Sequence, residues 1–273
     1  MSESTFVTIL IPAGNPGPLT GPGNNTYLLI GHDGNAMLVD AGVGAPEHLA
    51  RLQQHLIEHR TRLRRVLVTH AHPDHASGAP AVARAFPGAV FSKYPWPEED
   101  ASIDVAWTPI TDGHRFDQDG HVLTAVHTPG HAPDHVALWD AVNGTVYTGD
   151  LVLTTGSVMI PASKRGRLDD YMRSLERIRA LDAKRLLPAH GPAIDDPAGS
   201  IERHLAHRRL REQQILDALA AGPSTVQALA GSIYDGLAEA LVPAARENVR
   251  AHLDKLEAEG RAHQAHGVWT THP

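Results

Sequence analysis

Residues 69–75, which read THAHPDH, constrain this chain more than any other stretch. They place three imidazoles and one carboxylate straight after the apolar run of residues 66–68. Side chains alternate along a strand, so His70 and His72 are expected on the same side, and the proline at position 73 ends the strand and lets the last two donors turn back beside them. Four donor side chains within six residues have no packing use, so the motif predicts two neighbouring metal positions.

The composition limits which donors and which compartments are available. The 273 residues are 42% hydrophobic, which is ample for a buried core, and they include no cysteine. Metal ligands must therefore be nitrogen and oxygen atoms, and disulfides are excluded. No run approaches the roughly 18 apolar residues of a membrane span, and residues 1–5 lack the pattern of a signal peptide, so we expect a cytoplasmic protein with no membrane partner.

Strand and helix signals alternate through the first two thirds of the chain. The proline-rich stretch 93–100 is expected to be an irregular loop near the mouth of the site, and the helix at 77–86 is expected to direct its amino terminus at the site. Two sheets flanked by helices are the economical α+β arrangement. Strands are predicted at 6–11, 26–30, 36–39, 89–92, 121–127, 134–139, 145–148 and 185–187, and helices at 46–59, 77–86 and 169–180.

The composition changes after residue 196, where strand signals stop and helical spacing takes over. We place a boundary there, with a catalytic domain at 1–196 and a smaller domain at 197–273. The smaller domain is expected to be winged-helix-like, because helices precede a small hairpin. Its predicted elements are a helix at 201–220 with Leu205, Leu210, Ile215 and Leu219 on its apolar face, a helix capped by Ser224 and ending at Ile233, a helix at 246–259, and a hairpin at 261–264 and 268–271.

Three further donors follow predicted strands later in the chain. His131 ends the sequence TPGH, Asp150 follows YTG, and His190 lies within PAHG. In this order after residues 69–75, they resemble the metallo-β-lactamase superfamily, and the similarity covers about residues 6–195. The resemblance implies an αβ/βα sandwich of two mixed β-sheets flanked by helices, to which the winged-helix-like subdomain is appended.

The resemblance also assigns the donors to two metal positions that share one carboxylate. Two Zn²⁺ per chain are implied, with iron or manganese as alternatives because the second position includes a carboxylate. A hydroxide bridging the two ions would be the nucleophile of a hydrolase, and Asp74 would be catalytic by orienting it. The first position is implied for His70, His72 and His131, the second for Asp74, His75 and His190, and the bridge for Asp150.

Two other residues are expected close to the metals. Asp40, in the VDAG turn at 39–42, resembles the aspartate that supports the metal loop in this family without ligating. His135 is expected either to contact the substrate or to act as a core or supporting residue. For His114, His121 and His127 we expect surface or sheet positions without a role in the chemistry.

The substrate class is left open between several hydrolytic reactions. Residues 128–135, 188–192 and 249–260 resemble β-lactamase-like endoribonucleases that carry a winged helix, which favours a phosphodiesterase acting on single-stranded RNA. A glyoxalase II-like hydrolase of a small-molecule ester, thioester or lactone is the alternative. Asp150 argues against a β-lactamase, because the typical zinc β-lactamase lacks the bridging aspartate.

The non-enzymatic alternative is that the protein is a nucleic-acid-binding module with a vestigial metal site. The formal charge of −7 and the acids that offset the bases within 200–273 predict no strong basic face, which speaks against it. Lys164, Arg165 and Arg167 either face an anionic substrate or form a solvated run. We expect the smaller domain to complete the wall of the active site, and a homodimer is left open.

Overall fold

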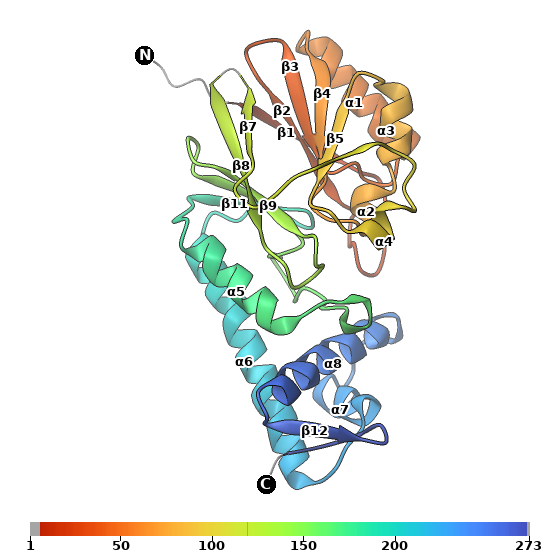
Figure 1. Cartoon of the computed structure of the whole chain (residues 1–273), viewed down its shortest axis with the longest axis vertical. Coiled ribbons are helices and arrows are strands. Elements are labelled where there is room, and N and C mark those ends of the chain that lie inside the picture. The colour runs from red at the N-terminus through yellow and green to blue at the C-terminus, as the bar shows by residue number, and fades with distance from the viewer. Residues whose placement is uncertain (1–5, 119, 272–273) are drawn as a thin grey trace.

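Two β-sheets packed face to face form the larger lobe of the computed structural model, which describes residues 6–118 and 120–271 (Figure 1). The first sheet has six strands, antiparallel from the first to the third and parallel from the third to the sixth. In spatial order they are β1 (Val7–Pro12), β2 (Asn25–Ile30), β3 (Asn35–Val39), β4 (Arg62–Leu67), β5 (Val90–Lys93) and β6 (Trp107–Pro109).

The second sheet has five strands, of which the first two neighbours run parallel and the others antiparallel. In spatial order they are β11 (Arg185–Pro188), β10 (Thr145–Gly149), β9 (Val136–Asp140), β8 (His121–His127) and β7 (Arg115–Gln118). Both sheets are therefore mixed, as predicted. Apolar side chains fill the space between them, with Leu29 and Met37 of the first sheet in one cluster with Leu123 and Leu138 of the second.

Helices cover the outer face of each sheet (Figure 1). Those of the larger lobe are α1 (Pro46–Glu58), α2 (Pro73–Ala76), α3 (Ala79–Ala85), α4 (Pro97–Asp100) and α5 (Leu168–Arg179), with the 3-10 turn η1 (Ala162–Lys164). Leu52 of α1 and Val82 of α3 pack on the first sheet, and Tyr171 and Leu175 of α5 pack on the second. This layering confirms the predicted αβ/βα sandwich.

The smaller lobe consists of helices followed by a hairpin, as predicted for a winged helix (Figure 1). Its elements are α6 (Pro197–Ala221), α7 (Val226–Ile233), the 3-10 turn η2 (Glu239–Leu241), α8 (Val242–Ala258), β12 (Ala262–Ala265) and β13 (Val268–Thr271). Trp269 is fully buried at its centre, in a cluster with Leu219, Leu229 and Leu253. The hairpin thus closes a separate small core.

Helix α6 joins the two lobes. It has 25 residues, which corresponds to about 37 Å. Ile201 and Leu205 belong to the core of the larger lobe, whereas Ile215 and Leu219 belong to that of the smaller lobe. The helix begins where the domain boundary was placed, but its first half packs on the larger lobe, so the boundary itself stays a prediction.

The structure differs from the sequence prediction beside the metal motif. β4 ends at Leu67, so His70 and His72 lie in the loop after the strand. The helix predicted at 77–86 is α3, which begins two residues later than predicted because α2 and α3 are separated at Gly78. A Cβ atom on Gly78 would lie 2.3 Å from the carbonyl oxygen of Ala41, so this glycine lets the chain pass close to the turn at 40–42. No helix begins at Ser77, so the expected helix amino terminus at that residue is not found.

Two short elements also departed from expectation. The stretch 93–100 was predicted to be irregular, yet it ends in α4, where Pro97 occupies the first turn that suits a proline. β6 and β7 were not predicted, because strands of three and four residues give little periodic signal. None of the helices within 6–118 and 120–271 is long and apolar enough to cross a membrane.

Two details of the smaller lobe were wrong as well. Thr225 caps α7 in place of Ser224, whose backbone pairs with Trp269. Leu210 is 55% exposed, because five residues after Leu205 place it about 140° around the helix. The buried position on that face is taken by Arg208, which is 1% exposed.

Candidate metal centre

The candidate ligands meet at one edge of the larger lobe because each follows the carboxyl end of a strand. Residues 69–75 follow β4, His131 follows β8, Asp150 follows β10 and His190 follows β11. These strands belong to both sheets, so the two sheets together bring the loops to one place. The sequence-predicted ligands are thereby assembled in three dimensions.

Two glycines allow the loops to approach their neighbours. Gly130 has φ 134°, and a Cβ atom there would lie 2.2 Å from the backbone nitrogen of Tyr171. Gly149 has φ 50°, and its Cβ would lie 2.6 Å from Nε2 of His135. Any other residue would displace the donor that follows directly in the chain.

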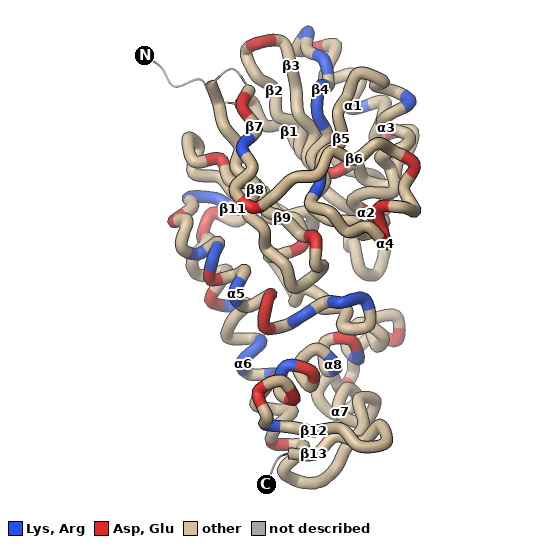
Figure 2. Tube along the Cα trace, viewed as in Figure 1, with Lys and Arg blue, Asp and Glu red and all other residues tan. Residues whose placement is uncertain are grey.

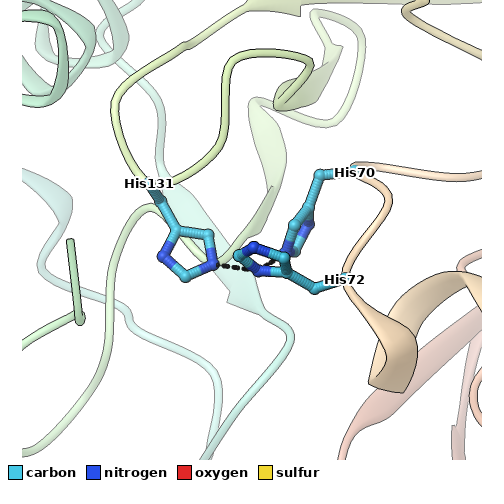
Figure 3. Close-up of side chains that lie close together, drawn as sticks. All are labelled: His70, His72 and His131. Carbon is cyan, nitrogen blue, oxygen red and sulfur yellow. Dashed lines mark hydrogen bonds between the residues drawn. The ribbon is translucent and has the colours of Figure 1, made fainter. Parts of the chain in front are cut away.

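His70, His72 and His131 turn their ring nitrogens toward one another (Figure 3). Nδ1 of His72 lies 3.0 Å from Nε2 of His70 and 2.8 Å from Nε2 of His131. Two nitrogens bound tetrahedrally to zinc at 2.0–2.1 Å would be about 3.3 Å apart. The three rings are thus arranged as ligands of one ion, which we call the imidazole group.

The imidazole group is neutral near pH 7. Burial, with the neighbouring rings, lowers the pKa of His70 well below its ordinary value and that of His72 to about 3. Burial likewise lowers the pKa of His131. Nδ1 of His72 contacts two ring nitrogens, and one proton can serve only one of these contacts. A cation shared by all three nitrogens satisfies them together, so the residues fit a metal ion.

Asp74, His75, Asp150 and His190 form a second set, which we call the mixed group; their ligand atoms lie within 4.8 Å of one another. Oδ2 of Asp74 lies 3.4 Å from Nε2 of His75 and 3.4 Å from Nε2 of His190. Oδ1 of Asp150 lies 3.4 Å and 3.2 Å from the same two nitrogens. Two carboxylates and two imidazoles thus converge on one point.

Asp150 faces both groups. Its Oδ2 lies 3.4 Å from Nε2 of His131 in the imidazole group, while Oδ1 faces the mixed group. Oδ1 is buried and has no hydrogen-bond partner among the described residues. A buried carboxylate oxygen in that state calls for a cation. The geometry fits the bridging position assigned from the sequence.

Carboxylates set the charge of the mixed group. Burial by itself would lower the pKa of His75, but the carboxylates of Asp150, Asp40 and Asp74 raise it well above its ordinary value. Against the same effect of burial, Asp150 and Asp74 raise the pKa of His190 to about 9. Protonated imidazoles therefore neutralise these acids in the metal-free protein, and a divalent cation competes with those protons.

Asp40 supports the motif from behind, without being a member of either group. Its Oδ1 accepts from the backbone N–H of Thr69 at 2.7 Å, and its Oδ2 lies 2.8 Å from Nδ1 of His75. The residue adopts the left-handed region with φ 64°. A proton on Nδ1 leaves Nε2 of His75 free to face the other members of the mixed group, so Asp40 orients a candidate ligand.

His135 lies beneath the site and is 0% exposed. Its Nε2 accepts from the backbone N–H of Asp150 at 3.1 Å, and its Nδ1 lies 2.8 Å from Oγ1 of Thr128. Burial lowers its pKa well below the ordinary value, which keeps Nε2 unprotonated. Of the roles that the sequence left open, the geometry favours holding Asp150 over contacting a substrate.

Two contributors were missed from the sequence. Nδ2 of Asn24 donates to Oδ2 of Asp74 at 3.0 Å. Nδ1 of His131 donates to the carbonyl oxygen of Met159 at 2.6 Å, which leaves Nε2 of His131 for the imidazole group. An asparagine pair in the glycine-rich loop was the only hint of the first, and a backbone carbonyl gives no side-chain signal for the second.

A cavity of about 570 Å³ opens onto both groups. His72, Asp74 and Asp150 are among the donors that line it. Its other walls are mainly apolar and come from both lobes. The larger lobe contributes Leu19, Leu153, Val158 and Met159, and the smaller lobe contributes Tyr234, Leu237, Leu241, Ala244 and Ala245.

The three basic residues after the Asp150 loop face different surroundings. Lys164 lines the cavity. Arg165 lies 3.3 Å from a carboxylate oxygen of Glu98, and Arg167 lies 3.0 Å from one of Asp169. Among the three, Lys164 is therefore the residue placed to meet an anionic group of a substrate.

This sandwich, with histidine and aspartate groups at one edge and a winged helix behind them, defines a class of metal-dependent hydrolases. The chain belongs to the metallo-beta-lactamase superfamily, which residues 19–190 match. Residues 225–269 match the beta-lactamase associated winged helix domain. These matches confirm the two families of domain that the sequence predicts, a metallo-β-lactamase domain and a winged helix.

Relatives resemble the chain over most of its length. Beta-lactamase-like protein 2 homolog of Drosophila melanogaster is 35% identical over 277 residues, covering 96% of this chain and 91% of that protein. Atrochrysone carboxyl ACP thioesterase of Aspergillus fumigatus is 32% identical over 216 residues, covering 77% of this chain and 64% of that protein. Hydrolases are thus among its relatives, and the chain is a metal-dependent hydrolase of this fold.

Solved structures share the architecture. A metallo-beta-lactamase family protein from Thermus thermophilus has a TM-score of 0.82 at 24% identity, covering 97% of this chain and 98% of that chain. A protein solved in a di-iron-bound form has a TM-score of 0.55 at 26% identity, covering 72% of this chain and 98% of that chain. The first likeness concerns the fold alone and includes the smaller lobe.

Proposed function

We propose that the chain hydrolyses a carboxylic ester or thioester with an apolar acyl group, using two metal ions held by the imidazole and mixed groups. The observation that carries this proposal is the mainly apolar cavity of about 570 Å³ directly above both groups. Apolar lining with a few polar groups is typical of sites for small organic substrates. A relative named as a thioesterase supports the same reaction class.

The metals would supply a water molecule with a pKa near 7 and polarise the carbonyl group. His70, His72 and His131 would hold one ion, and Asp74, His75 and His190 the other, with Asp150 between them. We propose zinc, which suits three neutral imidazoles, while iron or manganese also suits a group with carboxylates. The di-iron form of a similar protein is in line with that second option.

The chain itself positions the reacting groups. Asp74 lines the cavity, and Asn24 donates to its Oδ2 and thereby fixes the carboxylate. We assign to Asp74 the orientation of the attacking water. Water adds to the carbonyl carbon, the carbon–sulfur or carbon–oxygen bond breaks, and the thiol or alcohol leaves with one proton. The apolar walls exclude other water while the acyl group is bound.

Lys164 further narrows the range of substrates that we expect. It is a cation on an otherwise mainly apolar lining, and no carboxylate of the described residues lies within 4 Å of its Nζ. A substrate that carries a carboxylate or phosphate at a distance from the scissile bond would therefore be favoured over a neutral one.

Cleavage of single-stranded RNA is the second candidate, and the winged helix match supports it. Lys and Arg are interspersed with Asp and Glu along α5 and α8, so the electrostatic attraction for a polyanion is weak (Figure 2). Lys255 and Arg261 of the smaller lobe both lie 2.7 Å from Glu212. These pairings make the ester or thioester the better-supported substrate.

A substrate screen separates the two candidates. Metal-loaded protein is incubated with acetyl and decanoyl thioesters of N-acetylcysteamine, matching oxygen esters, a lactone, a β-lactam and a single-stranded RNA oligonucleotide. We expect the decanoyl thioester or ester to be hydrolysed with a higher kcat/KM than the acetyl compound, because the longer chain fills the cavity. Cleavage of RNA with every ester and thioester left intact would contradict the proposal.

A further inference from the structure

The segment 158–160 orients one of the candidate ligands. The carbonyl oxygen of Met159 accepts from Nδ1 of His131 at 2.6 Å. This bond fixes the ring and its tautomer, so that Nε2 points at His72, 2.8 Å away. Bonds of this kind to the second ring nitrogen tune metal binding, and their loss weakens it. The position of one backbone carbonyl therefore bears on the imidazole group.

The side chains of Val158 and Ile160 pack in the core of the larger lobe, but the hydrogen bonds to their backbone come from side chains of α6 and α8. Nη2 of Arg208, on α6, donates to the carbonyl oxygen of Val158. Oδ1 of Asn248, on α8, accepts from the backbone N–H of Ile160 at 2.9 Å and from Nη1 of Arg208 at 3.3 Å. Two side chains from different helices thus bind the residues on either side of Met159.

These two side chains are buried, so they depend on their protein hydrogen-bond partners in place of water. Arg208 is 1% exposed and Asn248 is 6% exposed. The guanidinium also lies over the ring of Tyr171, 5.1 Å from its centroid. No carboxylate of the described residues lies within 4 Å of it, so the Val158 carbonyl and the Asn248 amide are the acceptors for Nη2 and Nη1, while the buried Nε has no partner among the described residues. A buried guanidinium without these acceptors would be costly, so the arrangement holds the segment firmly.

The other end of the same loop is held from α6 as well. Nε2 of His204 lies 3.0 Å from the carbonyl oxygen of Leu153, three residues after Asp150. Both ends of the loop between Asp150 and η1 are therefore hydrogen-bonded to α6, while its apolar side chains pack in the core of the larger lobe. Its geometry depends on how those helices sit against the larger lobe.

We propose that Arg208 and Asn248 are positioning residues of the metal centre, acting through the Met159 carbonyl on the tautomer and orientation of His131. The inference rests on the proposed function in one respect, that His131 is a metal ligand. It gives the winged helix a role in the chemistry that does not depend on nucleic acid. The two lobes are then coupled at the imidazole group.

Cobalt(II) substitution tests this role with a readout other than activity. The visible absorption of bound cobalt(II) reports the number and arrangement of its ligands. Metal-free full-length protein is titrated with cobalt(II), for wild type, Asn248→Ala, Arg208→Met, the conservative Asn248→Asp, and His131→Ala as the reference for losing the ligand. Asn248→Asp keeps an oxygen that can accept from Ile160 and Arg208. Leu253→Ala, at a fully buried position on α8 in the core of the smaller lobe, controls for destabilisation alone.

We expect Asn248→Ala and Arg208→Met to weaken the binding of one of two cobalt ions by about 10- to 100-fold and to shift its absorption toward that of His131→Ala. Asn248→Asp should bind and absorb as wild type does. Leu253→Ala should lower the melting temperature and leave the spectrum unchanged. If Arg208→Met does not fold, Asn248→Ala carries the test, because it leaves the guanidinium in place.

Two outcomes would overturn the inference, and they are distinguishable. If Asn248→Ala melts lower yet binds cobalt with wild-type affinity and spectrum, the two residues are structural only and the proposed function stands. If wild type binds no cobalt at either group, the proposed metal centre fails, and the inference fails with it.

Discussion

The two lobes contribute different kinds of residue to one cavity. The larger lobe supplies both ligand groups found among the described residues, and each ligand follows a strand end. The smaller lobe supplies apolar walls such as Leu237 and Leu241 and, through Arg208 and Asn248, the support of the segment at 158–160. The candidate ligands follow strands of the larger lobe, whereas part of the cavity wall comes from helices of the smaller lobe. The sequence of the wall can therefore change without changing the ligands. We therefore expect changes in the larger lobe to abolish the reaction and changes in the smaller lobe to alter substrate preference or metal geometry.

The largest effect is expected in the larger lobe, from Asp74→Ala. The variant removes the carboxylate that we propose as a metal ligand and as the group that orients water, and we expect α2 and the sheets to keep their packing. We expect kcat to fall by about 10³-fold or more, with a melting temperature close to that of the metal-free wild type. Steady-state kinetics on the decanoyl thioester and thermal melts measure both. Asp104→Ala, at an exposed position, is the matched control, and near wild-type turnover by Asp74→Ala would show that the mixed group is not catalytic.

The next largest effect is expected on metal binding, where a variant of Asp150, which faces both groups, should differ from a variant of a residue that belongs to one group. Because Asp150 faces both groups, Asp150→Asn should weaken the binding of both ions, by about 100-fold. His72→Ala should lose one ion and retain the other, since it belongs to the imidazole group alone. Equilibrium dialysis followed by elemental analysis gives both numbers. Two ions bound by Asp150→Asn at wild-type affinity would remove the bridging role.

A smaller effect is expected from the wall that the smaller lobe provides. Leu241→Asp places a charge on the apolar lining, so KM for the decanoyl thioester should rise by about 10-fold. Metal content should stay unchanged, because Leu241 is not one of the candidate ligands. Leu210→Asp is the matched control, since Leu210 is an exposed leucine of the same lobe. If both variants behave alike, the smaller lobe does not shape the substrate site.

The smallest effect on turnover is expected from a buried histidine of the larger lobe that belongs to neither ligand group. Burial, with Arg51 nearby, lowers the pKa of His48 to about 4. The unfolded chain, with an ordinary pKa near 6.5, binds this proton more readily, so stability is complete above about pH 6.5 and is lost as the pH falls toward 4.

This loss amounts to at most about 3 kcal/mol, and activity near pH 7 should not change. Denaturant unfolding at several pH values measures it, with His48→Gln as the comparison. Nε2 of His48 lies 2.8 Å from Oγ1 of Thr26, a contact that a glutamine amide can replace. The variant should show a flatter dependence of unfolding free energy on pH. An equal slope in both proteins would mean that His48 carries no such effect.

The ligand groups could be predicted from the sequence because their donors are few, clustered and tied to strand ends. Residues 69–75 leave little choice of chemistry, and His131, Asp150 and His190 each close a turn after an apolar run. Alternation of apolar residues likewise predicted most strands of both sheets. The features that could be predicted are those that depend on residues close together in the sequence.

The supporting contacts could not be predicted, because they join residues far apart in the chain. Met159 acts through its carbonyl oxygen, which every residue carries, and Arg208 looked like one of many surface arginines. Counting leucines on α6 even placed Leu210 on the face that Arg208 occupies. Such roles depend on how the two lobes pack against each other, and a local sequence pattern does not predict that packing.

Metal content coupled to turnover tests the central claim most directly. The protein is purified without chelator, its transition metals are counted by elemental analysis, and hydrolysis of the decanoyl thioester is followed as metal is removed and added back. We predict two ions per chain, loss of hydrolysis on removal, and full recovery at two equivalents of zinc. Protein that carries no transition metal, or that hydrolyses the thioester equally well without it, would contradict the account.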